Sequence, residues 1–126
     1  MPTGHGKVAY ALRRVMGEAA ANVLLQNGQE NKIYQFTGSE LYSYQDVANE
    51  LSLLSGKTVN YTDADATMFP DKLKELGVPE ISIMIASGFS ADIKNSQYEI
   101  VSNDLEKLLG RRPTSLKGSL KEIYSF

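Results

Sequence analysis

The pattern of hydrophobic and polar positions is clearest between residues 32 and 57, where it predicts a strand and then a capped helix. The run Lys32–Thr37 is rich in β-branched and aromatic residues, which favour a strand, and Gly38 breaks it. Ser43 and Asp46 have the spacing of a capping box that opens the next helix, with aspartate in place of glutamate. Apolar residues then recur on one helical face, and a glycine suited to the left-handed conformation ends the helix (Val47, Leu51, Leu54 and Gly56).

The remaining pattern predicts short elements along the rest of the chain. Residues Met1–Gly6 are expected to form a flexible lead, and β-prone runs follow at Lys7–Ala11 and Thr58–Thr62. Helices are predicted at Gly17–Gln26, from an N-cap at Thr67 to Leu76 with Pro70 in its first turn, from near Glu80, at Asn103–Leu109, and after a cap at Ser115. The residues expected to face inward include Ala19, Ala20, Val23, Leu24, Leu73 and Leu76.

The segment after Pro79 divides into two parts. Its first part is apolar over too wide an arc for an exposed helix, so a buried or interface helix is expected there. The stretch Gly88–Tyr98 is polar and is expected to be irregular. The whole pattern predicts an α/β fold that is rich in helix and has a few short strands.

Length and composition fit one ordinary globular domain of 126 residues, with 42% hydrophobic residues and a net charge of −2. The net charge argues against nonspecific nucleic-acid binding, which needs a basic surface. No apolar run approaches the roughly 20 residues that span a bilayer, and no signal peptide is visible, so no membrane partner and a cytoplasmic location are predicted. With no cysteine and one histidine, thiol chemistry and multi-histidine metal sites are excluded.

Two short motifs suggest dinucleotide chemistry but lack its structural context. Gly4-His5-Gly6-Lys7-Val8-Ala9 fits the G-x-G-x-x-A fingerprint, yet only three residues precede it, where a strand is required. We interpret these glycines as a turn. The Tyr-x-x-x-Lys spacing of short-chain reductases is absent, and Tyr10 has Arg14 in the lysine position. No catalytic, cofactor-binding or metal-binding residue is predicted.

Other candidate motifs have simpler structural explanations. The helix–turn–helix pattern around Leu73–Ala86 offers isoleucines where DNA recognition needs polar side chains. Asp63, Asp65 and Asp71 lack the spacing of a calcium loop, and His5 lies near a terminus. The pairs Arg13-Arg14 and Arg111-Arg112 are expected to be solvated surface.

One set of residues remains as a candidate binding site. Phe89 and Tyr98 could line a flat apolar pocket, and Lys94 between them could approach a phosphate or a carbonyl oxygen. The alternative is that both aromatic residues belong to the core and Lys94 is solvated.

Several landmarks, in order, resemble a known family. The landmarks are Gly6–Ala9, Glu18–Leu24, Lys32–Gly38, Leu51–Lys57, Leu76–Pro79 and Leu108–Ser115. In this succession they resemble the C-terminal half of the NmrA-like atypical short-chain dehydrogenase/reductases, and most closely the NAD(P)H:quinone oxidoreductase type 2 members. The resemblance covers nearly the whole chain from Gly4 onward.

The resemblance implies a division of labour between two halves. In such proteins an N-terminal Rossmann domain holds NADP or NAD, and the C-terminal half closes a smaller lobe over nicotinamide and substrate. The expectation is therefore a substrate lobe that lacks its Rossmann half, binds a quinone-like molecule and is inactive alone. The Lys32–Thr37 strand would lie at the edge of the dinucleotide-binding sheet, so self-association through this exposed edge is expected.

Two further points follow from the resemblance. The family commonly opens its first helix with Arg-x-Asp, whereas Arg13-Arg14-Val15 lacks the carboxylate, so the helix start loses its cap. The family also includes regulators that sense NAD(P) without turnover, which is the second possible function of this chain. A third possible function is that of a stand-alone interaction module. This half of the sequence does not separate these functions.

Overall fold

The computed structural model describes all residues from Met1 to Phe126 and has six helices around a minimal two-stranded ribbon. The ribbon pairs β1 (Lys7–Val8) with β2 (Tyr42–Ser43) in antiparallel register, Lys7 opposite Ser43 and Val8 opposite Tyr42. The helices are α1 (Arg13–Leu25), α2 (Tyr44–Ser55), α3 (Phe69–Glu75), α4 (Glu80–Lys94), α5 (Asp104–Leu109) and α6 (Leu116–Tyr124). This confirms the predicted helix-rich α/β fold with few short strands.

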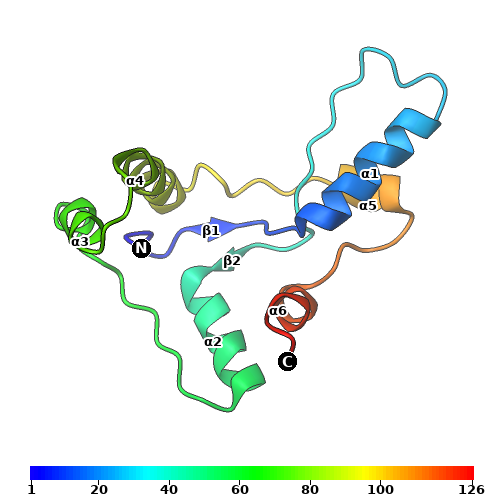
Figure 1. Cartoon of the computed structure of the whole chain (residues 1–126). Coiled ribbons are helices and arrows are strands. Elements are labelled where there is room, and N and C mark those ends of the chain that lie inside the picture. Colours follow the sequence, from blue (N-terminus) through cyan, green and yellow to red (C-terminus); the bar gives the residue numbers. More distant parts are fainter.

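The helices pack in three pairs around this ribbon. Helix α1 lies against α5, α2 against α6, and α3 against α4, while α4 also contacts β1. Figure 1 shows the three pairs as separate arms, with the N-terminus near α3 and α4 and the C-terminus at the end of α6. The arms touch mainly where they meet the ribbon, so the arrangement is open.

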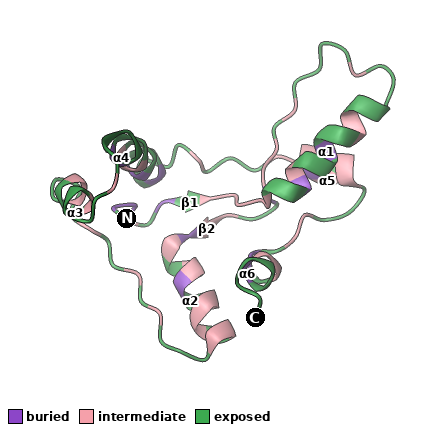
Figure 2. Cartoon of the chain, viewed as in Figure 1, coloured by how far each residue is buried: buried purple, intermediate pink, exposed green.

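Few residues are buried, and most of them lie in the contacts within each pair or at the N-terminal turn. The completely buried cluster consists of Val15 and Ala19 from α1 and Leu105 from α5. Only 14 of the 126 residues are buried, and exposed residues cover much of α1, α3, α4 and α6, whereas α2 and α5 are mainly half-buried (Figure 2). The accessible surface is 8566 Å². A compact monomer of 13.9 kDa would expose about 6,700 Å². The excess, roughly 1,900 Å², is more than twice what one partner buries in a standard protein interface.

Helix α2 forms as predicted because its signals are local. The Ser43 hydroxyl accepts a hydrogen bond from the Asp46 N–H at 3.2 Å, and the Asp46 carboxylate accepts one from the Ser43 N–H at 2.7 Å. Gly56 ends the helix with φ of 68°, which a glycine adopts without steric cost. The caps at Gly110 and Ser115 are likewise confirmed.

Helix α1 begins earlier than predicted and has no side-chain cap. It starts at Arg13, and its N-cap residue Leu12 offers no hydrogen-bonding side chain, as expected from the missing carboxylate. Ala19 is buried, but Ala20 is exposed and Leu24 is 87% exposed, so the predicted inward face is wrong at these two positions. The reason is that α5, the partner of α1, is only six residues long and covers only part of it.

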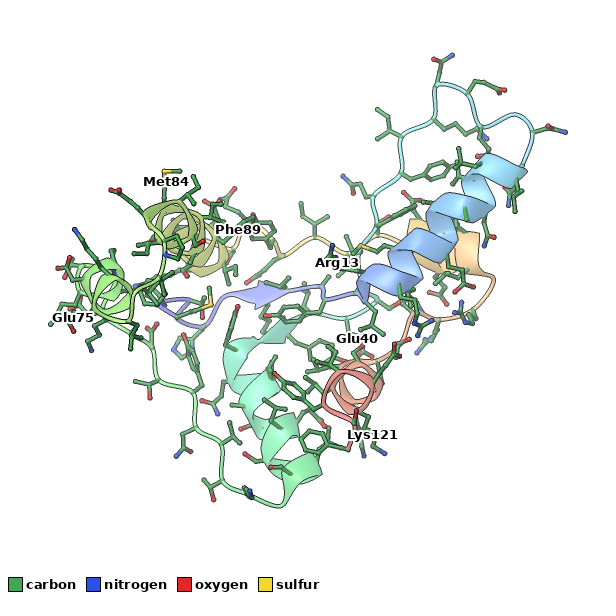
Figure 3. The ribbon with its side chains drawn as sticks, in the orientation of Figure 1. Arg13, Glu40, Glu75, Met84, Phe89 and Lys121 are labelled. Carbon is green, nitrogen blue, oxygen red and sulfur yellow. The ribbon has the colours of Figure 1, made fainter.

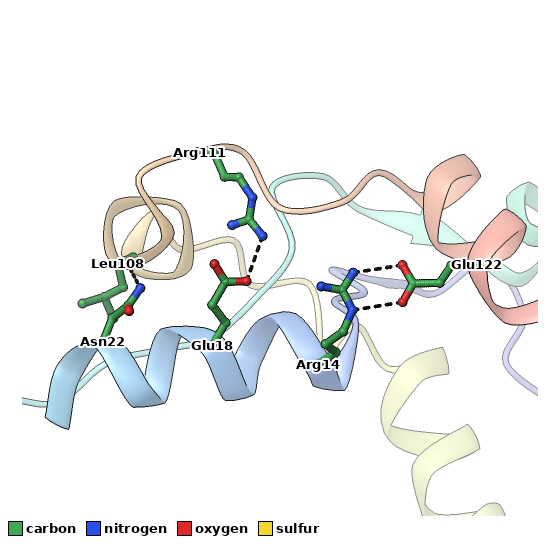
Figure 4. A network of polar contacts seen from close by, with 6 residues as sticks. All are labelled: Arg14, Glu18, Asn22, Leu108, Arg111 and Glu122. Atoms are coloured by element: carbon green, nitrogen blue, oxygen red, sulfur yellow. Dashed lines mark hydrogen bonds and ion pairs between the residues drawn. The ribbon is translucent and has the colours of Figure 1, made fainter. Parts of the chain in front are cut away.

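One face of α1 makes polar contacts to three other segments (Figure 4). Arg14 donates two hydrogen bonds to Glu122 of α6, at 3.0 and 2.9 Å. Four residues on, Glu18 accepts from Arg111 at 2.9 Å, and four residues further the Asn22 amide donates to the Leu108 carbonyl at 2.8 Å. The ion pairs are exposed and therefore contribute little stability, but they fix α1 relative to α5 and α6. The arginines predicted to be solvated are thus exposed and partly paired.

The predicted strands at Lys32–Thr37 and Thr58–Thr62 are wrong. Between Ile33 and Thr37 the only bonded backbone amide is that of Gln35, which donates to the Asp104 carboxylate at 2.9 Å. A strand requires a neighbouring strand, and this chain places none beside either segment. Both segments keep a β-prone sequence without a ladder.

Two other expectations about helices need correction. The predicted irregular stretch is helical as far as Lys94, because the buried Ser90 hydroxyl donates to the Ala86 carbonyl at 2.6 Å and so satisfies its polarity within the helix. Thr67 does not cap α3, since both its amide and its hydroxyl donate to Asp65. Pro70 lies in the first turn as expected, but Leu76 is 79% exposed rather than inward.

Residues 1–6 pack against the chain instead of forming a detached lead. Thr3 is completely buried, and both its amide and its hydroxyl are hydrogen-bonded to the Tyr61 hydroxyl, at 3.2 and 2.7 Å. Gly6 is also buried, where β1 crosses the end of α4. A Cβ atom at Gly6 would lie 1.9 Å from the Ile93 carbonyl oxygen. Glycine is therefore required for this crossing.

This crossing generates a stability prediction. Gly6→Ala should lower the free energy of unfolding by about 2–4 kcal/mol, because the obstructing atom is backbone and cannot rotate away. Gly17→Ala is the matched control. Gly17 lies inside α1 with open space around it, so a methyl group there should stabilise the chain by about 0.5–1 kcal/mol. Urea unfolding followed by circular dichroism measures the free energy of unfolding of both variants. Equal changes in the two variants would contradict the close contact between Gly6 and the Ile93 carbonyl.

Candidate functional site

Two of the three residues predicted as a site come together at the C-terminal end of α4. The rings of Phe89 and Tyr98 have centroids 5.9 Å apart and an interplanar angle of 36°. Phe89 is 49% exposed, so the pair is an accessible aromatic surface rather than part of the core. Figure 3 shows Phe89 at the end of α4 next to the linker that leads to α5.

Lys94 is directed to a different place. Lys94 lies five positions after Phe89, so in a helix the two side chains point in directions about 140° apart. Its side chain lies over the turn at Gly4, whose added Cβ would be 3.4 Å from Lys94 Cγ, and its charge acts on Asp63. The structure therefore brings Phe89 and Tyr98 together and places Lys94 near the N-terminal turn.

Hydrogen bonds hold the turn that carries Tyr98. After α4 the chain turns tightly, with Ser96 at φ of 60° and the Gln97 amide donating to the Asp92 carbonyl at 3.0 Å. The Glu99 carboxylate then accepts from the Lys7 amide of β1 at 3.2 Å and from the Ser96 hydroxyl at 3.1 Å. Glu99 thus ties the turn that carries Tyr98 to the central ribbon.

Tyr98 also borders a groove of about 300 Å³. The groove lies between β1, the extended segment 35–37 and the segment 97–100. The Thr37 hydroxyl accepts a hydrogen bond from the Ser102 amide at 2.8 Å. This bond ties the extended segment 35–37 to the segment that follows Ile100. The lining of the groove is apolar and aromatic apart from Thr37 and two side-chain amides (Val8, Ala9, Gln35, Phe36, Thr37, Gln97, Tyr98 and Ile100).

The chemistry of this groove is that of binding and not of proton transfer. Aromatic faces can stack on a flat conjugated ligand, and the amides of Gln35 and Gln97 can donate hydrogen bonds to a carbonyl oxygen. No carboxylate, histidine or lysine lines it. The groove therefore needs a reactive partner brought by something else.

The residues of this chain do not form a dinucleotide cradle. The G-x-G-x-x-A match lies in a turn that leads into β1, whereas pyrophosphate binding needs the turn to open a helix. The Ile93 carbonyl occupies the space beside Gly6, and Gly4 faces Lys94 and Asp63. No room for a pyrophosphate is left at Gly6. No group of three or more potential metal ligands lies together either.

A second hollow, of about 230 Å³, was not predicted from the sequence. It lies between the start of α1, α2 and α6, and Tyr10 and Tyr44 contribute to its wall. The Tyr10 and Tyr44 rings meet edge to face, with centroids 6.5 Å apart. Burial raises the pKa of both hydroxyls, so they stay protonated and can act as donors but not as bases. Tyrosines far apart in sequence gave no signal of this arrangement.

Sequence comparison finds relatives that match nearly the whole chain. It is 32% identical over 123 residues to quinone oxidoreductase 2 of Escherichia coli, which covers 97% of this chain and 43% of that protein. It is 28% identical to festuclavine synthase II of Penicillium roqueforti over 91% of this chain and 40% of that protein. The chain thus spans less than half the length of the curated relatives it matches. No family model matches it.

Solved structures are similar to this chain over nearly its whole length. Triphenylmethane reductase of Citrobacter sp. superposes on 100% of this chain and 44% of its own, with a TM-score of 0.93 at 30% identity. The NADPH complex of quinone oxidoreductase 2 from E. coli superposes on 97% of this chain and 43% of its own, with a TM-score of 0.91 at 30% identity. The chain therefore has the fold of the C-terminal part of the NmrA-like reductases. Among these, it is related in sequence and structure to quinone oxidoreductase 2, so the predicted resemblance is confirmed.

None of the helices is both long enough and apolar enough to cross a membrane. The cytoplasmic location stays a prediction.

The N-terminal turn next to Lys94 generates a prediction about pH. The Gly4 amide donates to the Asp63 carboxylate at 2.9 Å, and with Tyr61, Lys94 and His5 nearby it holds the pKa of Asp63 below its usual value. A carboxylate with a lowered pKa in the folded state stabilises that state when ionised. This contribution is present above the usual carboxyl range and is lost as the pH falls through the lowered pKa.

Asp63→Asn should therefore reduce the loss of stability between pH 7 and pH 3, measured as the midpoint of urea unfolding. Asp92→Asn is the control, because Asp92 is an exposed aspartate of α4 whose carboxylate accepts no hydrogen bond. An unchanged pH dependence in Asp63→Asn would show that the contact with Gly4 does not hold residues 1–6.

Proposed function

We propose that this chain is the substrate-binding lobe of an NAD(P)H-dependent quinone reductase and is inactive by itself. The observation that carries the proposal is the likeness over nearly the whole chain to less than half of quinone oxidoreductase 2. In this division the nicotinamide supplies the hydride, and the protein binds and orients the acceptor. A quinone is a flat conjugated ring with two carbonyl oxygens, which suits the aromatic faces and the side-chain amides of the groove.

The properties of the lobe agree with this division of labour. Its groove has no carboxylate, histidine or lysine side chain, and its glycine turn does not form a dinucleotide cradle. Its surface exceeds that of a compact monomer by roughly 1,900 Å², which fits a chain that packs against another body. We propose that this body is a Rossmann domain holding NADP or NAD. An isolated lobe with so much uncovered apolar surface should also associate with itself, which size-exclusion chromatography tests.

The activity can be tested by joining this chain to the nucleotide-binding half of E. coli quinone oxidoreductase 2. We expect the fusion protein to oxidise NADPH in the presence of 1,4-benzoquinone, and the isolated chain to be inactive. A fusion protein that folds and binds NADPH but reduces no quinone would contradict the proposal and would favour a sensor of the dinucleotide.

The aromatic pair gives a sharper prediction within the same fusion protein. Tyr98→Ala should raise KM for 1,4-benzoquinone about three- to tenfold, because one stacking surface is lost. Tyr98→Phe keeps the ring and should leave KM nearly unchanged. Phe89→Ala should act like Tyr98→Ala, whereas Lys94→Ala should have little effect because Lys94 lies over Gly4. A larger effect of Lys94→Ala than of Tyr98→Ala would overturn this assignment of the groove.

A further inference from the structure

Helix α4 carries an apolar strip that its own packing does not explain. Ile81, Ile85 and Phe89 follow one another at intervals of four residues, so they lie along one face of the helix. Their exposed fractions are 59%, 50% and 49%. The packed side of α4 is formed by other residues, namely Ile83, Ser90 and Ile93, which are all buried. The strip therefore lies outside the core.

The strip is continuous with the candidate site. Its last residue, Phe89, stacks on Tyr98, and Tyr98 borders the groove. From Ile81 to Phe89 the helix rises by roughly 12 Å, which is the length of an extended chain of about ten carbon atoms. An apolar path thus leads from the groove along the outside of α4.

The strip is narrow at Ile85 and wider near Ile81, because Met84, three residues after Ile81, is 63% exposed. The neighbours of Ile85 at three residues before and after it are Ser82 and Gly88, which are both exposed and small. A side chain added at Gly88 would meet no atom within 4 Å. A single alkyl chain fits such a path, with small side chains leaving open space on both sides of Ile85.

We propose that the strip binds the apolar tail of an alkyl-substituted quinone whose ring lies in the groove beside Tyr98. This inference rests on the proposed function and adds a substrate class to it. The tail would cover the exposed parts of Phe89, Ile85 and Ile81 in turn, and removal of this apolar surface from water supplies the affinity. A quinone without a long substituent would bind through its ring alone.

The proposal can be tested on the 126-residue chain by NMR with isoleucine methyl labelling. The probes are a decyl-substituted 1,4-benzoquinone and its methyl-substituted counterpart. We expect the decyl compound to shift the methyl signals of Ile81 and Ile85, and the methyl compound to leave them in place. Ile33 and Ile123 serve as internal controls, since both are exposed and lie outside the strip. Because the chain has no cysteine, thiol addition to the quinone cannot produce the shifts.

Ile85→Ser should weaken binding of the decyl compound about tenfold, which corresponds to losing contact with roughly two methylene groups. Serine and isoleucine have similar helix propensities, so α4 should persist. Ile33→Ser makes the same replacement at a site that is 92% exposed and should leave the affinity unchanged.

Three results would overturn the proposal. They are the absence of shifts at Ile81 and Ile85, equal shifts at Ile33 and Ile123, and equal affinity for both quinones. None of them bears on the turnover of 1,4-benzoquinone by the fusion protein, which tests the proposed function separately.

Discussion

The limited burial of apolar side chains is the constraint on which the rest of this structure depends. Each pair of helices buries a few residues between its members, and little apolar surface is shared between pairs. A domain gains most of its stability from burying apolar surface in one continuous core. Here the three arms meet mainly at a ribbon of two residues per strand, and so many apolar side chains remain in water. The fold has the local order of a domain without a core large enough for its length.

The close contacts at the centre of the ribbon explain how the arms keep their positions. Gly6 lets β1 pass directly over the Ile93 carbonyl, and Gly38 lets the chain approach the Tyr10 carbonyl, where a Cβ would lie at 2.1 Å. Glu99 adds a bond from the α4 side of the chain to the backbone of β1. These contacts hold the aromatic pair against the ribbon and the groove. Precise backbone packing at the centre thus coexists with exposed apolar surface at the periphery.

The sequence predicted those elements whose causes are local. The capping box and the glycine stop of α2 act within a few residues, and so do the caps of α5 and α6. The prediction of a strand at Lys32–Thr37 is wrong because a strand depends on a neighbouring strand, which no local pattern supplies. The predicted end of α4 is wrong because Ser90 is polar and suggests irregular structure, whereas its hydroxyl donates a hydrogen bond to a carbonyl of the helix backbone.

The helical end of α4 also explains where the three residues of the candidate site lie in the structure. In an irregular stretch Lys94 could lie between Phe89 and Tyr98, but continuing the helix turns it toward Gly4 and leaves the two aromatic residues together. Gln35 could not be found from sequence, because folding alone brings its segment to the groove. In the proposed division into two halves, residues 33–37, whose backbone amides other than that of Gln35 are unbonded, would lie at the interface with the second body. Amide hydrogen exchange of these residues tests this claim most directly, in the isolated chain and in the fusion with the nucleotide-binding half of quinone oxidoreductase 2. We expect exchange of these amides to slow by about tenfold or more in the fusion. Equal exchange rates in a folded fusion protein that binds NADPH would contradict it.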